Sequence, residues 1–105
     1  MDTKELQKIE KEFDEQNWDH KDLPVSEQIR HITLHMGKLL GKLSTYSERM
    51  EHNINFSDEQ IRNEVTPDLL MHALRLSNLL GEDLEELYKN RLVNVKETLD
   101  KEYKK

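Results

Sequence analysis

The sequence predicts an all-α fold, an antiparallel four-helix bundle, and three observations lead to this prediction. The 105 residues include only three glycines and two prolines, too few for a β-sandwich or barrel, which needs a turn every ~8–12 residues. Apolar residues recur every three or four positions, the spacing of one helix face. Leu, Ile, Val and Phe together make up 27 residues, more than the roughly one-fifth share typical of disordered chains. Residues 1–105 are therefore expected to form a single helical domain.

The first two helices are separated by a loop that closes at a proline. The first helix is expected over residues 2–16, where Leu6, Ile9 and Phe13 share a face. Pro24 closes the loop, because proline disfavours a helical conformation in the residue before it. Ser26 is predicted to cap the second helix, which runs to about residue 50. Its core stripe comprises Ile29, Ile32, Met36, Leu39, Leu43, Tyr46 and Met50.

A third helical segment is expected after a loop over residues 53–56. Ser57 and Gln60 resemble a capping box that opens this segment at residue 58. Pro67 then either begins a new helix, with Thr66 as its N-cap, or kinks one helix over residues 58–80. Apolar side chains cover more than half of its circumference, so this helix is expected to be central: Leu69, Leu70, Ala73, Leu74, Leu76, Leu79 and Leu80.

Gly81 is predicted to end the central helix, because glycine readily adopts the left-handed conformation found at helix C-termini. The last helix is expected to begin near residue 82 and to fray over residues 101–105. Short connections between four helices favour an antiparallel bundle. The face of the last helix expected to be buried comprises Leu84, Leu87, Tyr88, the stem of Arg91, Val95 and Leu99.

Composition excludes several classes of site and partner. The chain has no cysteine, which excludes disulfides, thiolate zinc sites and a cysteine nucleophile. Its longest apolar runs are pairs or triplets and its N-terminus is acidic, so neither a membrane span nor a signal peptide is expected, and a cytoplasmic location is predicted. The net charge of −6 disfavours nucleic-acid polymers as partners. A chain this short builds a modest core, so self-association is expected.

Several sequence features resemble one enzyme family. Residues 74–81 read LRLSNLLG, residues 83–87 read DLEEL, and residues 13–19 read FDEQNWD. In these features the chain resembles the MazG-type all-α nucleoside triphosphate pyrophosphohydrolases. The resemblance implies a helical bundle that assembles as a dimer or tetramer. It also implies Mg²⁺-dependent hydrolysis of a (d)NTP to the (d)NMP and pyrophosphate.

The acids that the resemblance assigns to Mg²⁺ are largely replaced here. The E-E-x-x-E motif of the second helix, aligned on Gly37, falls on Leu34, His35 and Lys38. In the E-x-x-D motif of the third helix, Asp68 matches, but Val65 occupies the glutamate position. Mg²⁺ requires oxygen ligands, and lysines repel a divalent cation. We therefore predict a MazG-like protein that is catalytically degenerate and retains nucleotide or anion binding.

Two alternative sets of site residues remain open. A transition metal such as Zn²⁺ suits an imidazole-rich set, which would rebuild an active pyrophosphohydrolase from Asp68, Glu64, His35 and His72. A nucleotide or another anion would be held without metal by aromatic and cationic side chains, namely Trp18, His31, Lys38 and Lys42. The structural alternatives are histidines that flank the core, and lysines that form a solvated face or pair with acids of the first helix or of a partner chain.

Two further features concern packing. Gly37, Gly41 and Ser44 form a stripe of small residues, which is expected where another helix packs closely, within the bundle or across a dimer. This stripe supports a third functional alternative, a non-enzymatic helical interaction protein. Arg75 and Asn78, on the central helix, either line a pocket or are exposed, and of these exposure is expected.

Overall fold

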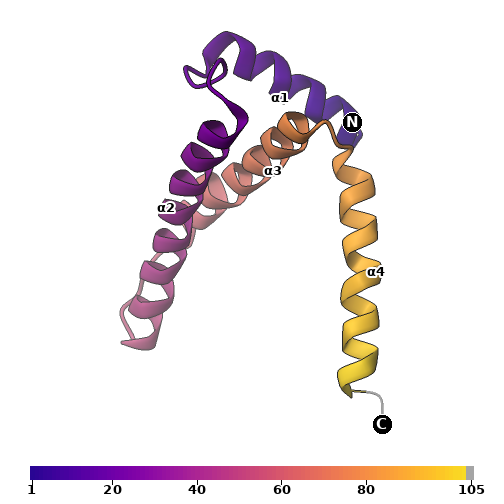
Figure 1. The fold of residues 1–105 in the computed structure, drawn as a ribbon. Helices are drawn as coiled ribbons and strands as arrows, with labels where there is room; N and C mark the ends of the chain where they lie inside the picture. The colour runs from indigo at the N-terminus through magenta and orange to yellow at the C-terminus, as the bar shows by residue number, and fades with distance from the viewer. Residues whose placement is uncertain (104–105) are drawn as a thin grey trace.

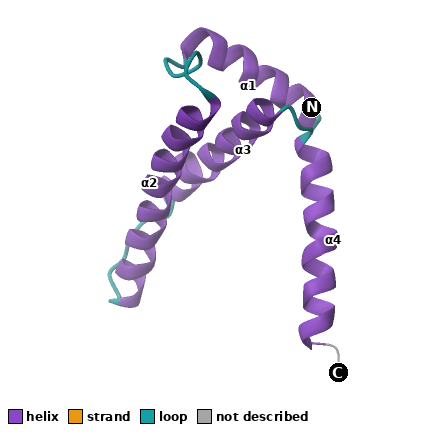
Figure 2. Cartoon of the chain, viewed as in Figure 1, coloured by secondary structure: helices purple, strands orange, loops and turns teal. Residues whose placement is uncertain are grey.

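A computed structural model describes residues 1–103, and over these residues the chain is helical with no strand. The described elements are α1 (Thr3–Asn17), α2 (Val25–Glu51), a short π-helix η1 (Ile61–Val65), α3 (Thr66–Leu80) and α4 (Leu84–Tyr103), as Figures 1 and 2 show. The predicted all-α class with four α-helices is confirmed. Within residues 1–103, no helix combines the length and apolar character needed to cross a bilayer.

The starts of the first two helices are set by local hydrogen bonds. The Asp2 carboxylate accepts a 2.8 Å hydrogen bond from the backbone N–H of Glu5 and so caps α1. For α2, the predicted Ser26 cap is wrong. The helix starts one residue after Pro24, whose carbonyl accepts bonds from the N–H groups of Glu27 and Gln28 at 2.9 and 3.0 Å. The fixed φ of proline orients this carbonyl at the helix start.

Pro67 leaves the third helical segment continuous. The Thr66 N–H bonds to the Ile61 carbonyl five residues back, which is the hydrogen bond of a π-turn. Because proline has no N–H and crowds the preceding turn, this wider turn accommodates Pro67 without ending the helix. Of the two alternatives, one continuous helical run is therefore confirmed. Ser57 does cap its start, since its hydroxyl accepts from the Glu59 N–H at 3.1 Å, but Gln60 donates to Glu64 and does not complete the predicted capping box.

The C-terminal end of α3 follows the prediction. Gly81 has a φ of 66°, in the left-handed region, and the Glu82 N–H bonds to the Ser77 carbonyl at 2.9 Å. This geometry stops the helix and redirects the chain into α4. The predicted fraying of residues 101–105 is wrong for residues 101–103, which continue α4, while residues 104 and 105 lie outside the described residues.

The apolar core is small and lies where α2 packs against η1 and α3. Its buried apolar side chains are Ile32, Leu39, Val65 and Leu74. The helix α1 packs across the upper part of α3 (Figure 1). The glycine stripe of α2 lies away from this core, because a Cβ built on Gly37 or Gly41 meets nothing within 4 Å. The close helix approach predicted for these glycines therefore does not occur within the described chain.

The helix α4 leaves the other three helices after its first turns and extends away from them (Figure 1). None of its residues is buried. The predicted burial of its apolar face is wrong for the single chain, since Leu87 is 40% exposed and Tyr88 61%. Arg91, Val95 and Leu99 are exposed as well, and Leu84 is half-buried. The radius of gyration is 17.0 Å, against about 13 Å for a compact domain of 100 residues.

Candidate functional site

A buried ion pair joins α1 to α3 at the base of the candidate site. Arg75 is 6% exposed, so its predicted exposure is wrong. Its Nε and Nη2 donate to the two oxygens of Asp14 at 2.9 and 2.7 Å, a bidentate pair. Its Nη2 also lies 3.7 Å from Oε2 of Glu10. Glu10 and Asp14 are one turn apart, so both carboxylates face the same arginine.

Glu10 titrates near neutral pH. The side chain is buried, and its Oε2 has no hydrogen-bond partner within the described chain. Burial, followed by the neighbouring Asp14 carboxyl, raises the pKa of Glu10 to about 7 against the opposing effect of Arg75. The cluster thus combines the bidentate Arg75–Asp14 pair with a carboxyl, that of Glu10, whose pKa lies in the neutral range.

Trp18 closes the end of α1 over the same arginine. The guanidinium carbon of Arg75 lies 4.3 Å from the centroid of the indole ring, a cation–π contact. The two side chains line two neighbouring hollows, one beside α1 and one beside the histidines described next. Trp18 therefore lies at the C-terminal end of α1 and borders both hollows.

Four histidines from three segments form a continuous row beside Trp18. His20 lies in the loop after α1, His31 and His35 on α2, and His72 on α3. Successive ring centroids are 3.7 Å (His20–His31), 4.5 Å (His31–His35) and 6.2 Å (His35–His72) apart. The row borders a hollow of about 360 Å³, which we call the histidine hollow; Trp18, Asp19, Asp68, Met71 and Arg75 complete its lining.

The surroundings of two histidines in the row, His72 and His31, favour the neutral imidazole. His72 is 4% exposed, and its Nδ1 is buried without a hydrogen-bond partner. Burial, then the charge of Arg75, lowers the pKa of His72. Burial, then the charge of His20, lowers the pKa of His31. At the rim of the hollow, Nδ1 of His20 lies 2.6 Å from Oδ1 of Asp19, and this hydrogen bond lowers the pKa of Asp19.

The structure brings together some of the predicted site residues and separates others. Asp68, His35 and His72 of the metal set line the same hollow as Trp18 and His31 of the nucleotide set. The remaining three residues do not line it. Lys42 forms an ion pair with Glu64 across α2 and η1, and this contact lowers the pKa of Glu64. Lys38 is exposed on α2.

The histidine hollow does not fit a magnesium ion. Its carboxylates are Asp19 and Asp68, and its other side-chain donors are mainly imidazoles, whereas Mg²⁺ requires a shell of oxygen ligands. Within residues 1–103, no three side chains of the His, Asp and Glu types gather closely enough to hold a metal ion. The chemistry available to these residues is therefore hydrogen bonding and proton uptake by imidazoles.

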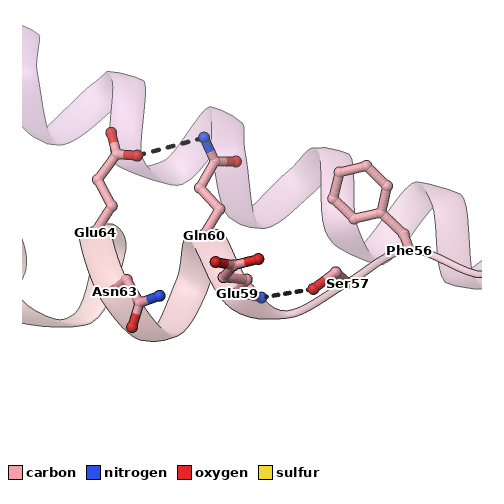
Figure 3. A pocket seen from close by; sticks show the side chains of 6 residues that line it. All are labelled: Phe56, Ser57, Glu59, Gln60, Asn63 and Glu64. Atoms are coloured by element: carbon pink, nitrogen blue, oxygen red, sulfur yellow. Dashed lines mark hydrogen bonds between the residues drawn. The ribbon is translucent and has the colours of Figure 1, made fainter.

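A larger hollow, of about 510 Å³, lies elsewhere, along the start of the third helical segment (Figure 3). Two hydrogen bonds lie within its lining: Ser57 accepts from the Glu59 N–H, and Gln60 donates to Glu64 at 3.4 Å. Most of its lining is exposed, and none of it is buried. This surface groove offers no unpartnered buried group and lies outside the candidate site.

Sequence reasoning missed the polar cluster of Glu10, Asp14 and Arg75 beneath the hollow. A signal for it exists, since two acids one turn apart interrupt the apolar pattern of α1, and a single arginine interrupts that of α3. No protein-family model, curated protein or solved structure matches this chain. The resemblance to MazG-type enzymes therefore stays a prediction from sequence.

Proposed function

We propose that this chain is a divergent MazG-like helical protein that binds a phosphorylated small molecule, a nucleotide, in the histidine hollow without hydrolysing it. The observation that carries the proposal is the convergence of Trp18, His31 and His35 on one hollow from separate elements. The volume of about 360 Å³ lies within the roughly 300–1,000 Å³ range of small-molecule sites.

The side chains that line the hollow suit an anionic ligand. A phosphate group near His31 would favour the protonated imidazole, which donates charge-assisted hydrogen bonds to phosphate oxygens. Arg75 already forms a bidentate pair with Asp14, so we assign it a positioning role, in which its guanidinium holds Trp18 in place. The indole offers an aromatic surface beside the imidazoles, which suits a nucleobase.

The same lining disfavours hydrolysis. An active pyrophosphohydrolase rebuilt from Asp68, Glu64, His35 and His72 would need Glu64, which is held by Lys42. The only carboxylates at the hollow are Asp68 and Asp19, and Asp19 is engaged with His20. We therefore expect no release of pyrophosphate from any (d)NTP with Mg²⁺, Mn²⁺ or Zn²⁺.

The proposal is tested by calorimetric titration of the full chain with ATP, AMP, adenosine and inorganic phosphate at about pH 6 and pH 8. ATP and AMP should bind and adenosine should not. Because anion binding is linked to proton uptake by histidines of lowered pKa, affinity should be at least about tenfold higher at pH 6. The variants His31→Gln and His35→Gln should lose this pH dependence, while His52→Gln, exposed at the end of α2, should keep it.

Three results would contradict the proposal. They are an absence of binding by every phosphorylated probe, equal affinity for adenosine and AMP, and equal affinity at the two pH values. Steady release of pyrophosphate that is lost in Asp68→Ala would instead support the rebuilt enzyme.

A second candidate function, that of a helical interaction protein, is favoured by the exposed apolar side chains of α4. The two functions are compatible, because the histidine hollow is built from α2, α3 and the loop after α1.

A further inference from the structure

The second hollow that Trp18 and Arg75 line lies beside α1, and we call it the α1 hollow. Its volume is about 210 Å³, below the roughly 300–1,000 Å³ of sites that hold a whole small molecule. Because the histidine hollow has the same two side chains in its lining, the two hollows adjoin each other. The α1 hollow therefore has the size and the position to take one end of a ligand whose other end lies in the histidine hollow.

Gln28 of α2 brings an unmet hydrogen-bond acceptor to the α1 hollow. The residue is 5% exposed and lines the hollow. Its Nε2 donates to the backbone carbonyls of Lys21 and Leu23 at 3.1 and 2.6 Å. These two carbonyls fix which end of the amide is the nitrogen, since an amide oxygen cannot donate. The other end, Oε1, is buried and accepts no hydrogen bond within residues 1–103.

The other charged and amide side chains of the lining are already satisfied. Lys11 and Glu15 are exposed, so water solvates them. The remainder have hydrogen-bond partners within the chain: Asp14 with Arg75, Lys21 with the carbonyl of Glu15, and Asn78 with Gln7. A buried acceptor that lacks a donor is costly. A ligand that satisfies the Oε1 of Gln28 therefore carries an N–H or O–H donor.

The charges around the α1 hollow favour a neutral donor over an ammonium group. Three cations line it against two carboxylates, namely Lys11, Lys21 and Arg75 against Asp14 and Glu15. The buried carboxylate, that of Asp14, is held by Arg75, so an added cation would find no free buried counter-ion. The indole of Trp18 and the side chain of Leu79 offer apolar surface to a planar ring. The lining thus fits a neutral, planar group that carries a donor.

We propose that the α1 hollow holds the base of the bound nucleotide, and that Gln28 selects a base with an exocyclic amino group, adenine or cytosine. This inference rests on the proposed function, which places the phosphate beside His31. The amino groups of adenine and cytosine are donors that the Oε1 of Gln28 can accept from. Hypoxanthine and uracil carry a carbonyl oxygen at the same position, which would set two acceptors against each other.

The first test is calorimetric titration of the full chain at about pH 6 with two pairs of nucleotides, AMP with IMP and CMP with UMP. The members of a pair share the sugar and the phosphate, and a carbonyl replaces the amino group of the base. In each pair the amino member should bind at least about tenfold more tightly, because its partner leaves the buried acceptor unsatisfied.

The variant Gln28→Lys tests the residue that makes the selection. Lysine keeps donors for the two loop carbonyls but has no acceptor, so the preference for AMP over IMP should be lost. Gln60→Lys is the matched control, since it adds the same charge at an exposed position outside both hollows and should keep the wild-type preference. The readout is the ratio of affinities within a pair, which a uniform effect of the added charge does not change. Far-UV circular dichroism checks the helix content of both variants.

The position of the base is tested by nuclear Overhauser effects between the base protons of AMP and methyl groups of the full chain. Leu79 lines the α1 hollow and not the histidine hollow, whereas Met71 lines the histidine hollow and not the α1 hollow. We expect contacts from the base protons to the methyl groups of Leu79 and none to that of Met71.

The outcomes separate this inference from the proposed function. Equal affinities for AMP and IMP, with tighter binding at pH 6 than at pH 8, would support the proposed function and overturn the selection by Gln28. Base contacts with Met71 instead of Leu79 would overturn the assignment of the α1 hollow. An unchanged preference in Gln28→Lys would overturn the role of this residue. An absence of binding by every nucleotide would overturn both the inference and the proposed function.

Discussion

Replacement of Arg75 by methionine tests the polar cluster that joins α1 to α3. The substitution keeps the volume of the side-chain stem but removes the cation between Asp14 and Glu10. The side chains of Arg75, Asp14 and Glu10 are 8%, 11% and 9% exposed, so solvent cannot replace the lost partner. Breaking a buried ion pair from one side costs about 3–5 kcal/mol. This loss is a large share of the free energy of unfolding of a typical domain, which is roughly 5–15 kcal/mol.

The measurement is urea unfolding followed by circular dichroism at pH 7, read as the free energy of unfolding. Arg75→Lys is the intermediate variant: it keeps the charge but loses the bidentate geometry and the planar stacking on Trp18. Its cost should be smaller, about 1–3 kcal/mol. Combining Arg75→Met with Asp14→Leu and Glu10→Leu should recover most of the stability, because no buried charge remains. A loss below about 1 kcal/mol in Arg75→Met would refute the account of this cluster.

Three further predictions concern titration and the helix end. The pKa of Glu10 is raised from its ordinary value of 4.5 to about 7, so the folded state binds the extra proton and the free energy of unfolding falls as pH rises between these values. Glu10→Gln should remove this pH dependence of the free energy of unfolding, a change on the order of 3 kcal/mol across that range. Urea unfolding at several pH values measures it. The lowered pKa values of His31 and His72 have the opposite sign: their contribution is present above about pH 6.5 and is lost as pH falls below it. His72→Gln should therefore flatten the acid side of the stability profile, and an unchanged profile would contradict the assigned burial. Gly81→Ala should lower the free energy of unfolding by about 1 kcal/mol because of the positive φ of 66°, and an unchanged value would argue against the left-handed cap.

Local signals in the sequence predict the helices well. The apolar spacing, the glycine stop at Gly81 and the alternative of a continuous helix at Pro67 all depend on residues close to one another in the chain. The helix boundaries differ by one or two residues where a backbone group replaces a side-chain cap, as Pro24 does for Ser26. The burial of α4 could not be predicted in this way, because it depends on whether a partner element covers its face.

The candidate site is only partly predictable for a similar reason. His31 and His35 are one turn apart on α2, Asp68 and His72 are one turn apart on α3, and all four line one hollow. Lys42 and Glu64 instead form an ion pair with each other, because their opposite charges lie on adjacent segments. Neither side chain lines the hollow. The inward face of α1 carries Glu10 and Asp14, while Ile9 and Phe13 are half-exposed. Apolar periodicity alone misassigns this face, because Arg75 on a distant segment determines it.

The central claim, that the histidine hollow holds a phosphorylated ligand, is tested most directly by the titration of the histidines themselves. The ring proton signals of all five histidines are followed by NMR across pH 5–8, with and without saturating ATP. The claim predicts that ATP raises the pKa of His31 by at least about one unit, while exposed His52, outside the hollow, titrates unchanged. Identical titration curves for His31 with and without ATP would contradict it.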